Sequence, residues 1–133
     1  MIMSKRHAVR EAFFKLRRAN PELGISQIVD LLVDYPAPKF FCTVENARRI
    51  LSRIDKGLSL SISNKNKVRM YHDIYKKWVE FRNRPENQGK NLKYTEHLQG
   101  ILDSEAPSFY LSRYTMMGQI SGPDNGVGGT RCY

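Results

Sequence analysis

The sequence has few cysteines, no long apolar segment and few acidic residues for its number of basic ones. Its two cysteines, Cys42 and Cys132, lie far apart in the chain, which fits neither a disulfide framework nor a zinc ligand set. No apolar run approaches the roughly 20 residues that span a bilayer, so we expect no membrane partner. Residues 1–6 are charged with no apolar stretch behind them, so we expect no secretory signal and a bacterial cytoplasmic location.

Positive charge is what the sequence has in excess. The 133 residues include 22 Lys and Arg against 13 Asp and Glu, a formal net charge of +9. A field of this sign attracts polyanions, among them nucleic acid. The same charge can serve solubility, membrane headgroups or an acidic protein partner, so charge alone leaves these alternatives open. Apolar content of 41% and charged content of 26% are typical of a folded, soluble globular protein.

A short motif occurs twice in the chain. Residues 36–41 are Pro-Ala-Pro-Lys-Phe-Phe and residues 105–110 are Glu-Ala-Pro-Ser-Phe-Tyr, so both contain Ala-Pro-x-Phe-aromatic. Apolar and helix-capping positions around the motif also match at the same register, and an insertion near residues 87–91 accounts for a shift upstream. These correspondences predict two diverged copies of one helical unit, residues 1–57 and 64–120, packed as one domain. Residues 121–133 form a Gly-rich tail that we expect to be flexible.

Each copy is predicted to contain three helices, which gives an all-α fold of six helices. Apolar residues at helical spacing place them over residues 8–19, 26–33, 43–56, 64–83, 95–103 and 112–120. We expect the short helices to be capped by Ser26 and Thr95, and the third helices by Thr43 and Ser112. The connectors that carry the repeated motif must be extended, because each proline fixes its own φ and restricts the residue before it.

The helix over residues 43–56 is the main candidate for a binding site. Its apolar residues form one stripe, and the opposite face carries Glu45, Arg48, Arg49, Ser52, Arg53 and Lys56. A capped basic helix that follows a short helix resembles the pair with which many proteins contact the DNA major groove. The link between the two helices has about eight residues, whereas the helix-turn-helix motif has three or four, so the pair would be a variant. A merely solvated charged face is the alternative.

Other residues suit a supporting role in binding. The first helix adds four basic residues fit for phosphate contacts, Arg10, Lys15, Arg17 and Arg18. In the second copy, Met117 and Gly118 replace Arg48 and Arg49, so we expect the first copy to lead in binding. The connector aromatics could stack on bases, but we favour a core role, because aromatics just before a helix cap commonly pack against the helix.

The sequence offers no catalytic or metal site. Asp30 and Asp34 share a helix face, but no histidine or further acid near them in sequence completes a metal site. The three histidines are scattered, and His97 replaces an apolar residue of the first copy. The glycines near the end follow no strand and open no helix, so they fail the test for a phosphate-binding loop. We therefore expect a protein that is not an enzyme and binds no cofactor.

The segment Pro-Ala-Pro-Lys-Phe-Phe-x-Thr-x-x-x-Ala-Arg-Arg-Ile resembles a family of small, uncharacterised basic proteins from gut bacteria and their phages or mobile elements. The resemblance covers most of residues 4–120 and implies a mobile-element context, without site residues. Together these observations predict a nucleic-acid-binding accessory protein, with DNA expected over RNA. The alternative is a structural or assembly protein, either a virion component or a small subunit of a larger complex, with self-association as a further option.

Overall fold

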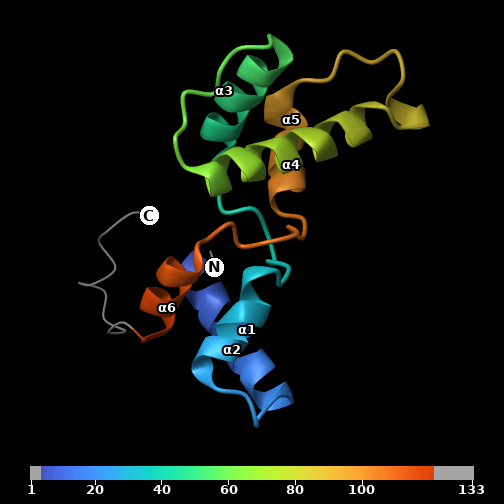
Figure 1. Cartoon of the computed structure of the whole chain (residues 1–133). Helices are drawn as coiled ribbons and strands as arrows, with labels where there is room; N and C mark the ends of the chain where they lie inside the picture. The colour runs from blue at the N-terminus through green and yellow to red at the C-terminus, as the bar shows by residue number, and fades with distance from the viewer. Residues whose placement is uncertain (1–3, 122–133) are drawn as a thin grey trace. The chain divides into compact units, whose positions relative to one another are not determined.

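The computed structural model describes residues 4–121 and contains six α-helices and one 3-10 turn in that range, with no strand (Figure 1). The all-α expectation is therefore confirmed. The elements are α1 (Lys5–Ala19), α2 (Ile25–Val33), α3 (Val44–Asp55), α4 (Lys65–Arg82), η1 (Pro85–Asn87), α5 (Tyr94–Leu102) and α6 (Arg113–Ser121). The predicted flexibility of the Gly-rich tail concerns residues that lie almost wholly outside the described range.

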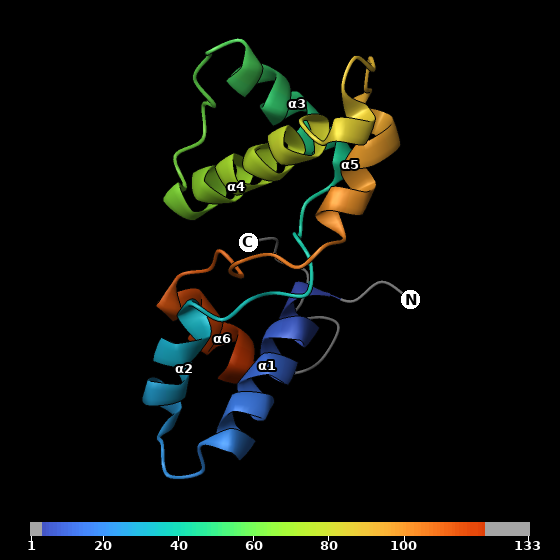
Figure 2. The ribbon, with the colours of Figure 1, turned by 90° about the vertical axis from the view of Figure 1, so that its right-hand side faces the viewer.

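The helices pack as two compact units that do not follow the order of the chain. Unit 1 comprises Met1–Tyr35 and Leu111–Tyr133, and unit 2 comprises Pro36–Tyr110. In unit 1, α1 and α2 pack with α6 and with each other, and in unit 2, α4 and α5 pack with α3 and with each other (Figures 1 and 2). The predicted repeats, residues 1–57 and 64–120, would place α3 with α1 and α2, and α6 with α4 and α5. Instead, α3 packs with α4 and α5, and α6 packs with α1 and α2. That the two units share one core stays a prediction.

Local capping sets most of the helix ends. The hydroxyl of Ser4 accepts a hydrogen bond from the backbone N–H of His7 at 3.0 Å, so α1 begins three residues earlier than expected. Thr43 and Ser112 cap the third helices as predicted, accepting from the N–H groups three residues on at 3.2 and 3.1 Å. The predicted caps on the short helices are wrong, because α2 begins after Gly24 and α5 begins after Lys93.

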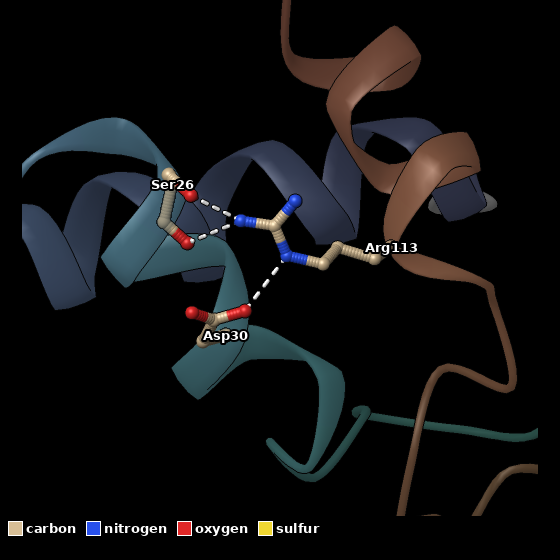
Figure 3. Close-up of polar contacts among 3 residues, drawn as sticks. All are labelled: Ser26, Asp30 and Arg113. Atoms are coloured by element: carbon tan, nitrogen blue, oxygen red, sulfur yellow. Dashed lines mark hydrogen bonds and ion pairs between the residues drawn. The ribbon is translucent and has the colours of Figure 1, made fainter.

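The core of unit 1 lies between α1 and α2, and α6 adds one fully buried residue. That residue is Met116. A polar clamp from α6 accompanies it (Figure 3): the Arg113 guanidinium donates from Nε to Asp30 Oδ1 at 2.7 Å and from Nη2 to the Ser26 carbonyl at 3.0 Å. The same Nη2 also reaches the Ser26 hydroxyl. This hydroxyl, predicted to be a helix cap, instead fastens α6 to α2.

The core of unit 2 is larger and includes both connectors. Ala37 and Ala106 exchange two backbone hydrogen bonds of 2.9 Å in an antiparallel bridge. Four aromatic rings of the connectors stack in two pairs, with centroids 6.2 Å apart for Phe40 and Tyr110 and 6.5 Å apart for Phe109 and the half-buried Phe41. Phe40, Phe109 and Tyr110 are each at most 5% exposed, so the core interpretation of these aromatics is confirmed over base stacking.

Candidate nucleic-acid interface

Helix α3 is anchored to unit 2 by one face and capped at both ends. Ala47, Ile50 and Leu51 are fully buried against α4 and α5. At the C-terminal end, Gly57 has φ +69°, the left-handed conformation that closes a helix and that glycine adopts without a steric penalty. Because the anchoring residues recur at helical spacing, the opposite face is directed outward.

Three of the four basic residues predicted on α3 are exposed on this outward face. Arg48, Arg49 and Lys56 point to solvent. Arg53 is half-buried, and its Nε donates to the Ser59 carbonyl at 2.7 Å. Arg53 therefore braces the segment that leaves α3, and its guanidinium is partly committed to the fold.

Asp55, the acidic residue at the end of α3, accepts hydrogen bonds from two tyrosines. Asp55 Oδ1 accepts from the Tyr75 hydroxyl at 2.6 Å, and Oδ2 accepts from the Tyr94 hydroxyl. The hydrogen bond to Asp55 raises the pKa of Tyr75, and for Tyr94 burial raises the pKa first and Asp55 second. Both carboxylate oxygens of Asp55 thus tie α3 to α4 and α5. Within residues 4–121, no ion pair involves Arg48, Arg49 or Lys56.

Helix α4 adds a second exposed basic stripe in unit 2. Met70, Ile74 and Trp78 face the core, and the opposite side of the helix carries the exposed residues Lys65, Arg69, His72 and Lys76. Arg69 is also held over the Tyr110 ring at 5.2 Å and donates to the Ser108 hydroxyl at 3.2 Å.

Lys77 of α4 has a structural role that sequence reasoning missed. Its Nζ donates to the Glu105 carbonyl at 2.9 Å and to the Ser104 hydroxyl at 3.3 Å, and it lies over the Phe40 ring at 5.6 Å. Lys77 therefore joins α4 to the second connector. No spacing in the sequence separates such a lysine from a solvated one.

The charge is concentrated in the unit that contains α3. Residues 36–110 hold 14 Lys and Arg against 8 Asp and Glu, whereas the rest of the chain holds 8 against 5. These counts give net charges of +6 and +3, which together make the +9 of the whole chain. In the described residues of unit 2, the ion pairs are Lys39 with Asp103 at 3.6 Å and His97 with Glu96 at 3.9 Å. Most of the positive charge of unit 2 is thus left without a partner carboxylate there.

The eight predicted site residues are divided equally between the two units. Arg48, Arg49, Arg53 and Lys56 belong to unit 2, and the four residues of α1 belong to unit 1. On α1, Lys15, Arg17 and Arg18 are exposed, whereas Arg10 is half-buried. Each unit therefore presents its own set of basic side chains.

The predicted pair of consecutive helices for groove binding is divided between the two units. The short helix α2 belongs to unit 1, and α3 belongs to unit 2. The short helix that packs against α3 is α5, which follows it in the chain by about forty residues. The variant helix-turn-helix interpretation is therefore wrong in its pairing, because α3 packs with α4 and α5 of its own unit.

A shallow groove of about 470 Å³ lies between α4 and α5. Phe81 and His97 form part of its lining, with ring centroids 4.9 Å apart, and Arg84 lies 5.4 Å over the Phe81 ring. His97 is half-buried. Residues 4–121 contain no group of three or more His, Cys, Asp or Glu that could hold a metal ion.

Comparison of the chain with protein-family models, with curated proteins and with solved structures gives no match. None of the helices described in residues 4–121 is long and apolar enough to cross a membrane.

Proposed function

We propose that the chain is a non-enzymatic nucleic-acid-binding accessory protein of a phage or mobile element, and that it binds duplex DNA through the outward face of α3. The observation that carries this proposal is the state of Arg48, Arg49 and Lys56. All three are exposed on one face of a helix that is capped and anchored, and none has an ion pair within residues 4–121.

The dimensions and rigidity of α3 support this proposal. Twelve residues at 1.5 Å per residue give a helix of about 18 Å, and the DNA major groove is about 12 Å wide and admits an α-helix. The helix is formed before binding, so little ordering entropy opposes association. Arginine can contact phosphates or the guanine edge, and Lys56 suits a phosphate.

The test is a salt titration with two matched triple variants. The first is Arg48→Ala, Arg49→Ala, Lys56→Ala, and the control is Lys67→Ala, Lys90→Ala, Lys93→Ala, which removes the same charge from exposed positions of the same unit outside both basic stripes. Binding to a labelled duplex is measured by fluorescence anisotropy at several salt concentrations. Each phosphate contact contributes about 0.9 to the slope of log affinity against log salt, so the α3 variant should lose up to about 2.7 of slope.

The comparison of the two variants decides the assignment. A parent protein that binds, an α3 variant that binds weakly and a control close to the parent would support the α3 face. Equal losses in both variants would mean that binding follows net charge and not this face. A parent that does not bind duplex DNA near physiological salt would overturn the proposal.

An assembly role is the second candidate, and exposed apolar side chains in unit 1 favour it. Tyr114 on α6 is 89% exposed, and Leu31 on α2 is 45% exposed. Self-association measured by light scattering, unaffected by nuclease and lost on Tyr114→Ser, would favour this role over nucleic-acid binding.

We also infer that the two units descend from one duplicated helical unit whose third helices have been exchanged. Three similarities support this inference. Each unit has a long helix and a nine-residue helix, each third helix follows a hydroxyl cap, and the two connectors pair at matching alanines. Each third helix also makes a polar contact that the other unit does not offer: Arg113 of α6 with Asp30 in unit 1, and Asp55 of α3 with Tyr94 in unit 2. These contacts support a specific match between each third helix and its unit.

A further inference from the structure

The outer face of α1 carries an aromatic ring that the core does not use. The buried residues of this helix, Ala8, Val9, Ala12 and Phe13, all lie toward α2 and α6. Phe14 lies on the opposite side and is 42% exposed. An exposed phenylalanine is unremarkable alone, so its surroundings decide what it can bind.

The ring of Phe14 is held by the core although it faces outward. It makes an edge-to-face contact with Phe13, with centroids 5.4 Å apart and ring planes at 76°. Phe13 is 1% exposed and fixed in the core of unit 1. The contact limits the conformations open to Phe14, which lowers the entropy that a ligand must overcome to stack on it.

Cationic side chains flank this ring. Arg17 and Arg18 follow Phe14 by three and four residues, a spacing that places them on the same helix face. Both are exposed, and no ion pair involves them in the part of the chain that the structure describes. Glu11, which shares the face, lies 3.2 Å from His7 Nε2. The ring is therefore bordered by positive charge on the side that leads to the end of α1.

We propose that this Phe14 face binds single-stranded nucleic acid, with the ring stacked on an unpaired base and Arg17 and Arg18 on the adjacent phosphates. A purely apolar partner would have to desolvate both guanidinium groups without pairing them. A single strand supplies the flat apolar surface and the anionic groups together. A duplex hides its base faces in its own stack, so it can use the arginines and not the ring.

This inference rests on the proposed function, because it assumes that the chain binds nucleic acid, and it adds a second surface with a different strand preference. Under it, α3 in unit 2 contacts duplex DNA and α1 in unit 1 contacts an unpaired strand. A chain that recognises both forms would suit a junction between duplex and single strand.

The test uses the full chain with Phe14→Ala, Phe14→Tyr and Leu31→Ala. Leu31 is a matched control, because it is similarly exposed on a helix of the same unit and its neighbours one turn away are Gln27 and Asp34 in place of arginines. Anisotropy is measured with labelled oligo(dT) and with a duplex of the same length. Base–aromatic stacking predicts a loss of roughly 5-fold or more in oligo(dT) affinity for Phe14→Ala.

The other variants should separate stacking from charge and from folding. We expect Phe14→Tyr to keep the oligo(dT) affinity, Leu31→Ala to leave it unchanged, and Phe14→Ala to leave the duplex affinity unchanged. Arg17→Ala with Arg18→Ala should lower the single-strand salt slope by about 1.4, at about 0.7 for each phosphate. Circular dichroism of every variant establishes that the helices are retained.

The outcomes distinguish this inference from the proposed function. If Phe14→Ala binds oligo(dT) as the parent does, or loses equally on duplex and single strand, the Phe14 face is not a stacking site, and duplex binding through α3 stands on its own test. If the parent binds duplex DNA but not oligo(dT), this inference alone fails. If it binds neither, both fail.

Discussion

The division of the chain into two units predicts that residues 36–110 fold alone and that residues 1–57 do not. The fragment 36–110 contains all of unit 2, with α3, α4 and α5 contributing 12, 18 and 9 helical residues. It also contains 14 of the 22 buried apolar residues found in the described part of the chain. The fragment 1–57 contains α1, α2 and α3. It lacks α6, which completes unit 1, and it also lacks α4 and α5, against which α3 packs.

The expected stability follows from the size of unit 2. Domains have about 0.05–0.15 kcal/mol of unfolding free energy per residue, and small ones lie at the low end because they bury less of their surface. For the 75 residues of unit 2 this gives about 4 kcal/mol. The helices of 1–57 have at most 15 residues each, a length at which isolated helices are marginal in water.

Urea unfolding of the two fragments provides the measurement. Trp78 is the one tryptophan of the chain and is 2% exposed in unit 2, so its fluorescence reports the core of 36–110 directly. Circular dichroism follows both fragments. We expect one cooperative transition for 36–110, coincident by both probes, and a gradual change for 1–57. Leu51→Ala should cost about 2–5 kcal/mol, at least half of the roughly 4 kcal/mol expected for 36–110, and should leave the signal of 1–57 unchanged.

Two outcomes would refute this reasoning. A cooperative transition in 1–57 that Leu51→Ala abolishes would mean that α3 packs with α1 and α2, as the contiguous repeats would have it. An unfolded 36–110 fragment would mean that unit 2 depends on the rest of the chain.

Two further predictions concern single contacts. Burial raises the pKa of Tyr71 to about 12 from 10.0, so the folded state holds the proton more tightly than the unfolded state, and stability present below pH 10 is lost as the pH rises toward 12. At 1.36 kcal/mol per pKa unit, the free energy of unfolding measured in urea should fall by about 2–3 kcal/mol more for the parent than for Tyr71→Phe over this pH range. Equal decreases in the two proteins would contradict the burial of this hydroxyl. Arg113 and Asp30 should show a coupling of about 0.5–1 kcal/mol in a double-mutant cycle, and this coupling should decrease with salt because the pair is exposed. Zero coupling at low salt would mean that this ion pair does not stabilise the docking of α6 on α2.

Much of the local structure could be predicted from the sequence. Apolar spacing located all six helices, and the hydroxyl caps at Thr43 and Ser112 marked the starts of the third helices. The predicted caps of the short helices failed for a local reason that is visible at α2. The Gln27 side chain accepts a hydrogen bond from the Gly24 N–H at 2.9 Å, so α2 begins without the Ser26 hydroxyl.

The pairing of helices could not be predicted, because an apolar stripe indicates that a face is buried but not which helix covers it. The contacts that distinguish the two third helices are polar and distant in sequence. Arg113 meets Asp30 across 83 residues, and Tyr94 meets Asp55 across 39. The site was predictable to the same extent: the outward face of α3 follows from spacing, whereas the bracing roles of Arg53 and Lys77 depend on backbone carbonyls that fold next to them.

The bridge between Ala37 and Ala106 lowers the cost of bringing α2 and α6 together in unit 1. Unit 2 separates α2 from α6 by 75 residues of chain, and closing a flexible loop of that length is unfavourable. When unit 2 is folded, the bridge holds Ala37 next to Ala106, near the two ends of the unit, so the segments that lead to α2 and α6 start from neighbouring points. With loop cost growing as (3/2)RT ln n, replacing a 75-residue loop by an effective one of about ten residues saves about 2 kcal/mol. That saving matters because α6 buries only Met116 fully. Unit 2, with its α3 face, should therefore be the independent element, and the α1 face should depend on it for the closure of unit 1.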